Sequence, residues 1–346
     1  MKRFMQTHRP WFTAAGRILR WVISIALLLV LFRMVDLGAL QTTLNDTRWW
    51  LVLAAFLLLS ADRIAYALRW KLILQPYTPW VRLGTLARIT YISTFLANFL
   101  PSALSADLVR GYFLRQEKAD LDEVVSSVTL DRVIGFGSQL LLALIALAAA
   151  YLQGFLPSGW LWIVLLLLGL TALGCGLIAT SWFGSLVARL QASRWRLVRR
   201  AGQMVKTIRS YPWTAARLIR VLGFACLAYI PAIFGSYLLF LAVGGSLPFS
   251  FFFLFILIVQ IAILIPVSIG GFGVHEGAWV VVMGTAGVPP ADALGYALLA
   301  HAVGLIVSLP GGMLYAVHRP QLAGRNARAL PQGSHSLPPE EILDLS

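Results

Sequence analysis

The chain has 346 residues, of which 59% are hydrophobic and only 12% are charged. A soluble domain of this composition would expose large apolar patches, so the composition excludes an ordinary soluble protein. The formal net charge of +14 comes from basic clusters between apolar runs, a pattern typical of cytoplasmic loops in membrane proteins rather than of a nucleic-acid-binding surface.

Eight apolar segments follow one another along the chain as candidate membrane helices. A helix needs roughly 20 apolar residues to cross about 30 Å of hydrocarbon. The candidate segments are 17–35, 49–69, 85–100, 124–151, 160–180, 217–243, 249–267 and 292–317. The sequence therefore predicts an all-α polytopic membrane protein.

Basic residues between these segments predict the side of the membrane that each loop occupies. Residues 1–16 are basic, and the segments 69–88 and 181–216 carry Arg and Lys without any acidic residue. The positive-inside rule places all three in the cytoplasm. The tail 319–346 is rich in Pro, Gly and Ser and predicts a disordered cytoplasmic tail. Both termini are then cytoplasmic, and the membrane domain extends over 17–318.

The same rule leaves two segments that must return to the side from which they entered. Residues 85–123 have both ends inside and residues 249–291 both ends outside, and each contains a proline followed by small or polar residues. We therefore expect about six full transmembrane helices plus two oppositely oriented broken re-entrant hairpins, which resembles an inverted-repeat transporter. Pro101 and Pro266 mark the two breaks, and Pro310 is expected to kink or end the last span.

The first break lies in the stretch "ANFLPSALSADLVRGYFLRQ", residues 97–116. Asp107 and Arg110 stand three residues apart, on one face of a helix. An unpaired charge inside a membrane is costly, so the pair indicates mutual neutralisation or a ligand. Alternatively, the segment lies at the cytoplasmic interface and the charges are solvated. Asn98 and Ser102, next to the break, are further candidate contacts for a lipid headgroup.

The stretch "SSVTLDRVIGFGSQ" carries a polar stripe at four-residue spacing, made of Ser127, Asp131, Gly135 and Gln139. Polar stripes on membrane helices usually face the interior of the bundle. Arg132, beside the stripe, is the strongest candidate for a phosphate contact, because a planar guanidinium suits phosphate oxygens. The alternative is a structural ion pair, either Asp131–Arg132 or Asp107–Arg132.

The second break lies in "PVSIGGFGVHEGAW", residues 266–279, and contains three glycines that permit unusual backbone angles, Gly270, Gly271 and Gly273. The helix that follows would aim its N-terminal N–H groups into a cavity, where anions are favoured. His275 and Glu276 lie in its first turn. Glu276 could carry a proton, pair with an arginine or meet a cationic headgroup. Alternatively, it only caps the helix or neutralises Arg110 or Arg132.

The remaining motifs predict helix packing or exclude particular enzyme activities. Ala300, Gly304, Ser308 and Gly312 form a row of small residues that predicts close helix packing. The chain has no P-loop, dinucleotide fingerprint or metalloprotease motif. Its two cysteines lie in apolar runs. We expect no metal, no cofactor and no nucleic-acid partner.

Four motifs, taken in order, carry a family resemblance: "FLANFLPSALSADLVRGYFLRQ", "VTLDRVIGF", "PVSIGGFGVHEGA" and "LPGGMLY". Together they resemble, over about residues 15–318, the transmembrane region of the lysylphosphatidylglycerol synthase/flippase family, also called flippase-like domain proteins. The first motif departs from the family pattern, which often has glycines where this chain has Ala103, Ser105 and Ala106.

The resemblance implies a bacterial or archaeal cytoplasmic-membrane protein that moves, or helps to move, a lipid between leaflets. In the synthase, this region flips an aminoacylated phospholipid made by a soluble C-terminal domain. Only a short tail follows residue 318 here, so we do not expect aminoacyl transfer. Some stand-alone relatives occur beside genes for glycolipid, polyprenol-linked glycan or hopanoid assembly.

Three functions remain open at this point. The first is a lipid flippase or scramblase-like transporter, in which Arg110 and Arg132 contact a lipid phosphate. The second is a membrane-embedded lipid-modifying enzyme or its subunit, with four possible acid or base groups, Asp107, Asp131, His275 and Glu276. The third is a non-transporting partner of lipid- or glycan-biosynthesis enzymes, which docks an acidic partner or the inner leaflet through its basic loop.

Overall fold

The computed structural model describes residues 14–100, 105–117, 119–152, 169, 214–264 and 267–328. Every regular element in these ranges is a helix, which confirms the all-α prediction. Several sequence predictions lie almost wholly outside the described residues: the span 160–180, the basic loop 181–216 and the N-terminal segment 1–16. Pro101, Ser102 and Pro266 also lie outside them.

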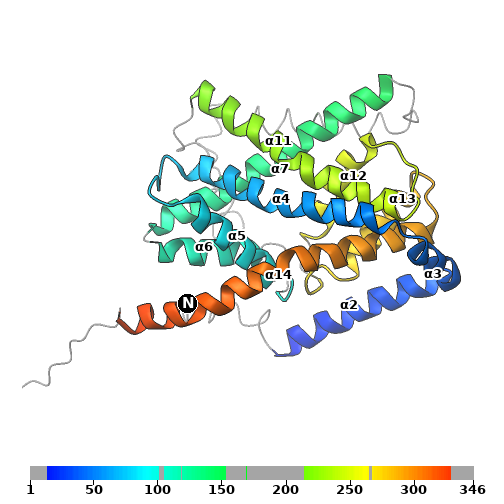
Figure 1. The fold of residues 1–346 in the computed structure, drawn as a ribbon, viewed down its shortest axis with the longest axis horizontal. Helices are drawn as coiled ribbons and strands as arrows, with labels where there is room; N and C mark the ends of the chain where they lie inside the picture. Colours follow the sequence, from blue (N-terminus) through cyan, green and yellow to red (C-terminus); the bar gives the residue numbers. More distant parts are fainter. Residues whose placement is uncertain are drawn as a thin grey trace, which may run out of the picture.

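Ten helices are present in the described part of the chain (Figure 1). They are α2 (Ala14–Met34), α3 (Leu37–Asn45), α4 (Trp49–Leu74), α5 (Leu83–Ala97), α6 (Ser105–Gln116), α7 (Leu121–Leu152), α11 (Ala215–Ala242), α12 (Ser250–Ala262), α13 (Val274–Gly284) and α14 (Pro290–Arg328).

Four of these helices, α4, α7, α11 and α14, are long and apolar enough to cross a membrane. A fifth span is possible if the bent pair formed by α2 and α3, which meet at 92°, crosses as one unit. The chain is therefore a multi-pass membrane protein. The helices on either side of the two predicted breaks, α5 with α6 and α12 with α13, are shorter, at 11 to 15 residues.

Helices α4 and α11 run side by side through the bundle, and α14 packs against both α5 and α13 (Figure 1). Gly235 in α11 permits the first of these contacts, because a Cβ there would lie 3.3 Å from the carbonyl oxygen of Ala55 in α4. The main core fills the space between α4, α11, α12, α13 and α14. Large aromatic side chains dominate this core, including Phe240, Phe252, Phe255, Trp279 and Tyr296.

Helices end close to both predicted breaks, and the two turns touch each other. Helix α5 ends at Ala97, and Gly270, Gly271 and Gly273, which all have positive φ, lie between α12 and α13. The backbone N–H of Gly270 donates to the carbonyl oxygen of Leu100, at 3.3 Å. A Cβ on Gly270 would lie 2.4 Å from the carbonyl oxygen of Asn98. Only glycine allows the two turns to approach this closely.

Helix α14 does not end at the proline of the LPGG motif, because it continues through Pro310 to Arg328. The glycines of the motif serve instead as a packing surface for α5. A Cβ on Gly311 would lie 2.0 Å from the carbonyl oxygen of Tyr91, and one on Gly312 would lie 2.8 Å from the ring of Phe95. The predicted packing role of the small-residue row therefore holds at Gly312.

Candidate functional site

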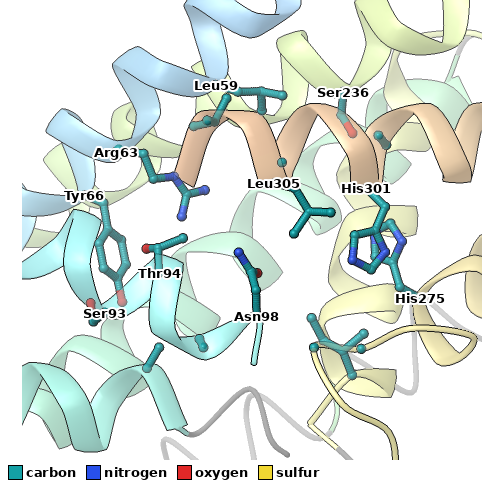
Figure 2. A pocket seen from close by; sticks show the side chains of 18 of the residues that line it. Leu59, Arg63, Tyr66, Ser93, Thr94, Asn98, Ser236, His275, His301 and Leu305 are labelled. Atoms are coloured by element: carbon teal, nitrogen blue, oxygen red, sulfur yellow. The ribbon is translucent and has the colours of Figure 1, made fainter. Parts of the chain in front are cut away.

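A cavity of about 390 Å³ opens where the two broken helix pairs meet α4 and α14 (Figure 2). Its apolar wall is interrupted by polar side chains: Arg63, Tyr66, Ser93, Thr94, Asn98, Arg110, Ser236, His275 and His301. The volume suits a small polar group such as a lipid headgroup.

Five of the residues predicted from sequence line this cavity: Asn98, Arg110, Gly270, Gly271 and His275. Five others do not line it but lie in the surrounding contacts: Asp107, Asp131, Arg132, Gly273 and Glu276. The residues next to both breaks thus reach the cavity wall.

Asn98 connects the first break to the long helix α14. Its side-chain N–H donates to the hydroxyl oxygen of Ser308, at 2.9 Å. Ala300 and Gly304, in the same small-residue row as Ser308, line the cavity. A Cβ on Gly304 would have no atom within 4 Å. Part of the row therefore leaves space for the cavity rather than packing against a helix.

Arg110 is the most buried charged side chain on the cavity wall, with 1% of the side chain exposed. Its guanidinium lies over the ring of Trp70, at 4.0 Å from the ring centre. One terminal nitrogen, Nη1, donates to Asp131 and to the hydroxyl oxygen of Tyr66. Two other nitrogens, Nε and Nη2, are buried without a hydrogen-bond partner. Both nitrogens are enclosed by protein atoms, so they are not exposed to the cavity.

Asp131 holds Arg110 in place and does not reach the cavity itself. Its two carboxylate oxygens accept from Arg69 Nε of α4 and Arg110 Nη1 of α6, each at 2.9 Å. Since only 1% of the Asp131 side chain is exposed, this aspartate is a buried counter-ion that joins three helices. Neither of its oxygens is left for a ligand.

Arg132 pairs with Asp107, which is one of the two ion pairs that the sequence left open. Arg132 Nε donates to Asp107, and 27% of the Arg132 side chain is exposed. Asp107 also lies 3.5 Å from Arg110 Nη1. Arg132 is not part of the cavity wall, so the geometry favours Arg110 over Arg132 as the arginine that meets a phosphate.

Three residues on α4 were not among the predicted site residues: Arg63 and Tyr66, which line the cavity, and Arg69, which binds Asp131. Arg69 was counted in the basic segment 69–88, yet its side chain is only 3% exposed and lies between the rings of Tyr66 and Tyr229. Gly135 makes room for it, because a Cβ there would lie 3.3 Å from Arg69 Nη2. The three-residue spacing of these side chains within an apolar run was the signal that could have found them.

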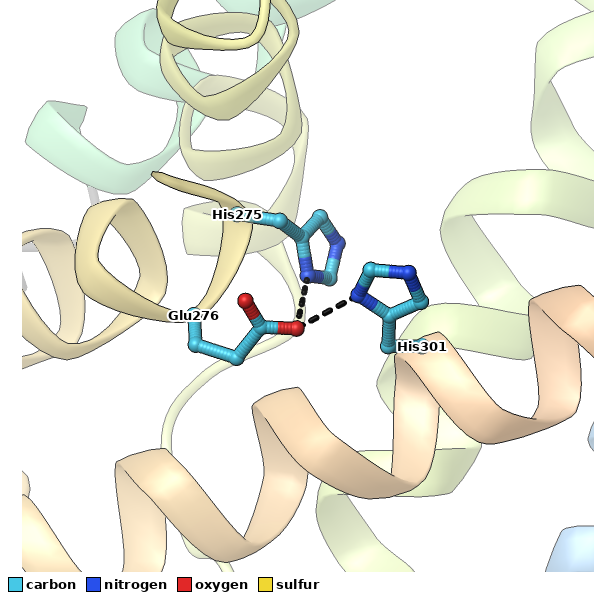
Figure 3. A group of neighbouring side chains, drawn as sticks. All are labelled: His275, Glu276 and His301. Atoms are coloured by element: carbon cyan, nitrogen blue, oxygen red, sulfur yellow. Dashed lines mark hydrogen bonds and ion pairs between the residues drawn. The ribbon is translucent and has the colours of Figure 1, made fainter. Parts of the chain in front are cut away.

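The opposite side of the cavity is built on the first turn of α13. Glu276 is fully buried, and its Oε2 accepts from the backbone N–H of Gly273 at 2.7 Å. Its Oε1 lies 2.5 Å from His301 Nδ1 and 3.6 Å from His275 Nδ1 (Figure 3). The capping role considered for Glu276 is therefore present, and its side-chain contacts are with histidines rather than arginines.

His275, Glu276 and His301 have ligand atoms within 4.8 Å of one another, which is close enough to hold a metal ion. The indole N–H of Trp279 donates to His275 Nε2, at 3.1 Å. A neutral His275 must then carry its proton on Nδ1, the nitrogen that faces Glu276. Metal binding through Nδ1, which has no hydrogen-bond partner, would require this proton to move to Nε2 with loss of the hydrogen bond from Trp279.

Helix α2 supports the second break from outside the cavity. The backbone N–H of Ile269 donates to the hydroxyl oxygen of Ser24, at 3.2 Å. A Cβ on Gly273 would lie 2.6 Å from the Cβ of Leu27. Gly273 is thus required by helix packing, whereas Gly270 and Gly271 contribute backbone to the cavity wall.

The sequence matches the family described as "Lysylphosphatidylglycerol synthase TM region" over residues 17–312. The matched range includes every residue of the cavity wall. No curated protein matches the chain.

Proposed function

The chain belongs to the lysylphosphatidylglycerol synthase transmembrane-region family, and on this basis we propose that it moves a phosphate-bearing lipid between the two leaflets of a membrane. The lipid is a phospholipid, a glycolipid or a polyprenyl-linked lipid. The observation that carries the proposal is the cavity between the two broken helix pairs, which Arg63 and Arg110 both line.

In the proposed topology, α5 with α6 and α12 with α13 are re-entrant hairpins that enter from opposite faces. They accompany about six full spans, including the predicted span 160–180. The contact between Gly270 and Leu100 supports this topology, because two hairpins from opposite faces would meet near the midplane.

The headgroup would enter the cavity while the acyl or prenyl tails remain in the surrounding lipid. Arg110 would bind phosphate oxygens from α6, and Arg63 would do so from α4, since both line the cavity. Guanidinium groups recognise phosphate well because their planar N–H groups match its oxygens. The sequence contains no nucleotide-binding motif, so we propose transport that runs downhill or is coupled to an ion gradient.

We place the protein in the cytoplasmic membrane of a bacterium or archaeon, with both termini in the cytoplasm. The basic loop 181–216 would then face the anionic inner leaflet, where it could also dock lipid- or glycan-biosynthesis enzymes.

A lipid-modifying enzyme is the second candidate, because His275, Glu276 and His301 adjoin the cavity as possible acid or base groups. Transport predicts that a lipid changes leaflet without changing mass, whereas an enzyme changes the mass of the lipid. Mass spectrometry of lipids incubated with the purified protein separates the two.

The direct test of transport is leaflet exchange in proteoliposomes. Fluorescent phospholipids and a fluorescent polyprenyl phosphate are reconstituted with the full chain, and probe in the outer leaflet is quenched chemically. Protein-dependent exchange of at least one probe is the expected result. Absence of exchange for every probe, with protein shown to be folded, would argue against translocation.

A further inference from the structure

Three potential metal ligands meet at the side of the cavity formed by α13 and α14. His275 and Glu276 lie in the first turn of α13, and His301 lies in α14 (Figure 3). Each offers one ligand atom, and these atoms all lie within 4.8 Å of one another. Two imidazole nitrogens and a carboxylate oxygen form a ligand set that suits zinc and similar transition-metal ions.

The ligand atoms are spaced nearly as they would be around an ion. Glu276 Oε1 lies 2.5 Å from His301 Nδ1 and 3.6 Å from His275 Nδ1. Ligands that bind zinc tetrahedrally at about 2.0–2.1 Å lie about 3.3 Å from one another. Side-chain shifts on the order of 1 Å would therefore bring the three atoms to the distances of a zinc site.

The charge of Glu276 gives the first independent reason to expect a cation here. The residue is fully buried, and its side-chain partners among the described residues are the two histidines, with no arginine or lysine in contact. By contrast, Asp62 and Asp131 are each paired with an arginine. Buried carboxylates in proteins are normally paired with a cationic side chain or coordinate a metal ion.

An unsatisfied nitrogen gives the second reason. His275 Nδ1 is buried and has no hydrogen-bond partner, although Figure 3 shows it directed toward Glu276. The separation of 3.6 Å from Glu276 Oε1 is too long for a hydrogen bond. A buried polar atom without a partner is unfavourable, and an ion between the three side chains would satisfy it.

The surrounding contacts already orient two of the ligands. Glu276 Oε2 accepts from the backbone N–H of Gly273 at 2.7 Å, which leaves Oε1 directed toward the histidines. The ring of Phe272 stacks on that of His301, with 4.1 Å between the ring centres. Metal ligands in proteins are usually held in place by outer contacts of this kind.

Metal binding has one local cost, which is the hydrogen bond from Trp279 to His275 Nε2. With Nδ1 on the metal, Nε2 carries the proton and no longer accepts. Loss of one hydrogen bond between neutral groups lowers affinity by about tenfold. The free energy of binding zinc in protein sites is several times larger, so this cost does not prevent binding.

We propose that His275 Nδ1, Glu276 Oε1 and His301 Nδ1 bind a divalent transition-metal ion, with zinc as the best match to these ligands. Both histidines line the cavity, so the fourth coordination position is on the cavity side and takes a water molecule or an oxygen of a bound headgroup. The inference goes beyond the proposed function and does not rest on it, because the ion binds without any lipid.

The test measures zinc binding to the full chain, purified in an uncharged maltoside detergent and freed of metal with a chelator. Zn²⁺ is then titrated by calorimetry at neutral pH. We expect one ion per chain with a Kd tighter than about 10 µM, which allows for weaker binding than in four-ligand structural sites. A Kd weaker than this overturns the proposal and leaves a protonated histidine as the partner of Glu276.

Two variants locate the ion. His301→Gln removes one ligand and should weaken zinc binding by at least about tenfold to a hundredfold, since even the outer contacts of metal ligands are worth that much. Asp292→Asn, on the same helix but outside the group, should leave the affinity unchanged. Equal affinities of the wild type and His301→Gln would place the ion elsewhere and overturn the assignment.

A cobalt spectrum of the wild-type chain gives a readout that does not depend on the folding of any variant. Co²⁺ bound in place of zinc should show the intense visible absorption of a four-coordinate ion, as expected for three protein ligands and one further oxygen. The weak absorption of six-coordinate aqueous Co²⁺, with no change on addition of protein, would contradict the site.

Discussion

The backbone N–H of Gly270 donates to the carbonyl oxygen of Leu100, at 3.3 Å. The turn after α5 therefore contacts the turn between α12 and α13. The two residues are far apart in sequence, yet both turns contribute to one cavity, through Asn98 on one side and Gly270 and Gly271 on the other. The shape of the cavity therefore depends on both breaks.

Substitution of Gly270 should therefore separate the turns. Gly270 has φ +61°, and a Cβ would lie 2.4 Å from the carbonyl oxygen of Asn98. We expect Gly270→Ala to destabilise the protein by about 2–4 kcal/mol, from left-handed backbone strain plus overpacking. Thermal unfolding in detergent measures the change.

Gly304→Ala is the matched control for that experiment. It also lies on the cavity wall, but a Cβ there has no atom within 4 Å, and the residue is inside a helix. Alanine in a helix is favoured over glycine by up to about 1 kcal/mol. Equal destabilisation by the two substitutions would contradict the contact between the turns.

Asp131→Asn should be strongly destabilising. The substitution leaves Arg69 and Arg110 buried without their shared counter-ion, and breaking a buried pair in this way costs about 3–5 kcal/mol. Asp46→Asn, at an exposed position after α3, should change stability by less than about 0.5 kcal/mol. Unfolding temperatures that fall by similar amounts for both variants would rule out the proposed role of Asp131.

The sequence predicted the helical class, helix ends next to the two proline positions, and five residues that line the cavity, whose role is not tested. These features were predictable because proline and clustered glycines act locally on the backbone. Arg69 was missed because it was assigned to the basic segment 69–88, and His301 because it is a single polar residue within an apolar run. Only the packing of α4 on α11 and of α13 on α14 gives these side chains their partners.

The choice of a phosphate ligand between Arg110 and Arg132 also depends on helix packing, which the sequence does not give. Both arginines contact Asp107, and the sequence favoured Arg132 as the phosphate ligand. Spacing along a helix gives the face that a residue occupies but not which neighbouring helix covers that face. In the structure, Arg110 faces the cavity and Arg132 lies outside its wall.

Exchange of anionic lipids should accordingly depend on Arg110 far more than on Arg132. Arg110→Gln removes charge-assisted hydrogen bonds of about 1.5–3 kcal/mol, which corresponds to a roughly tenfold to hundredfold loss of exchange rate. Arg132→Gln should retain exchange within about threefold, because the residue does not line the cavity and its ion pair with Asp107 is partly exposed. Proteoliposome assays of both variants, matched for protein folding and orientation, provide the comparison. A larger loss for Arg132→Gln would restore the assignment made from sequence.

His301 should be required as a hydrogen-bond donor to Glu276. His301 Nδ1 lies 2.5 Å from Glu276 Oε1, and Glu276 is fully buried. His301→Leu replaces this donor with an apolar side chain of similar bulk, so we expect destabilisation of about 1–3 kcal/mol. His301→Gln retains a side-chain N–H and should recover a measurable part of that loss. Unfolding measurements on the two variants separate the roles of the residue: if leucine and glutamine destabilise equally, the stacking of Phe272 on the His301 ring, at 4.1 Å, matters rather than the hydrogen bond.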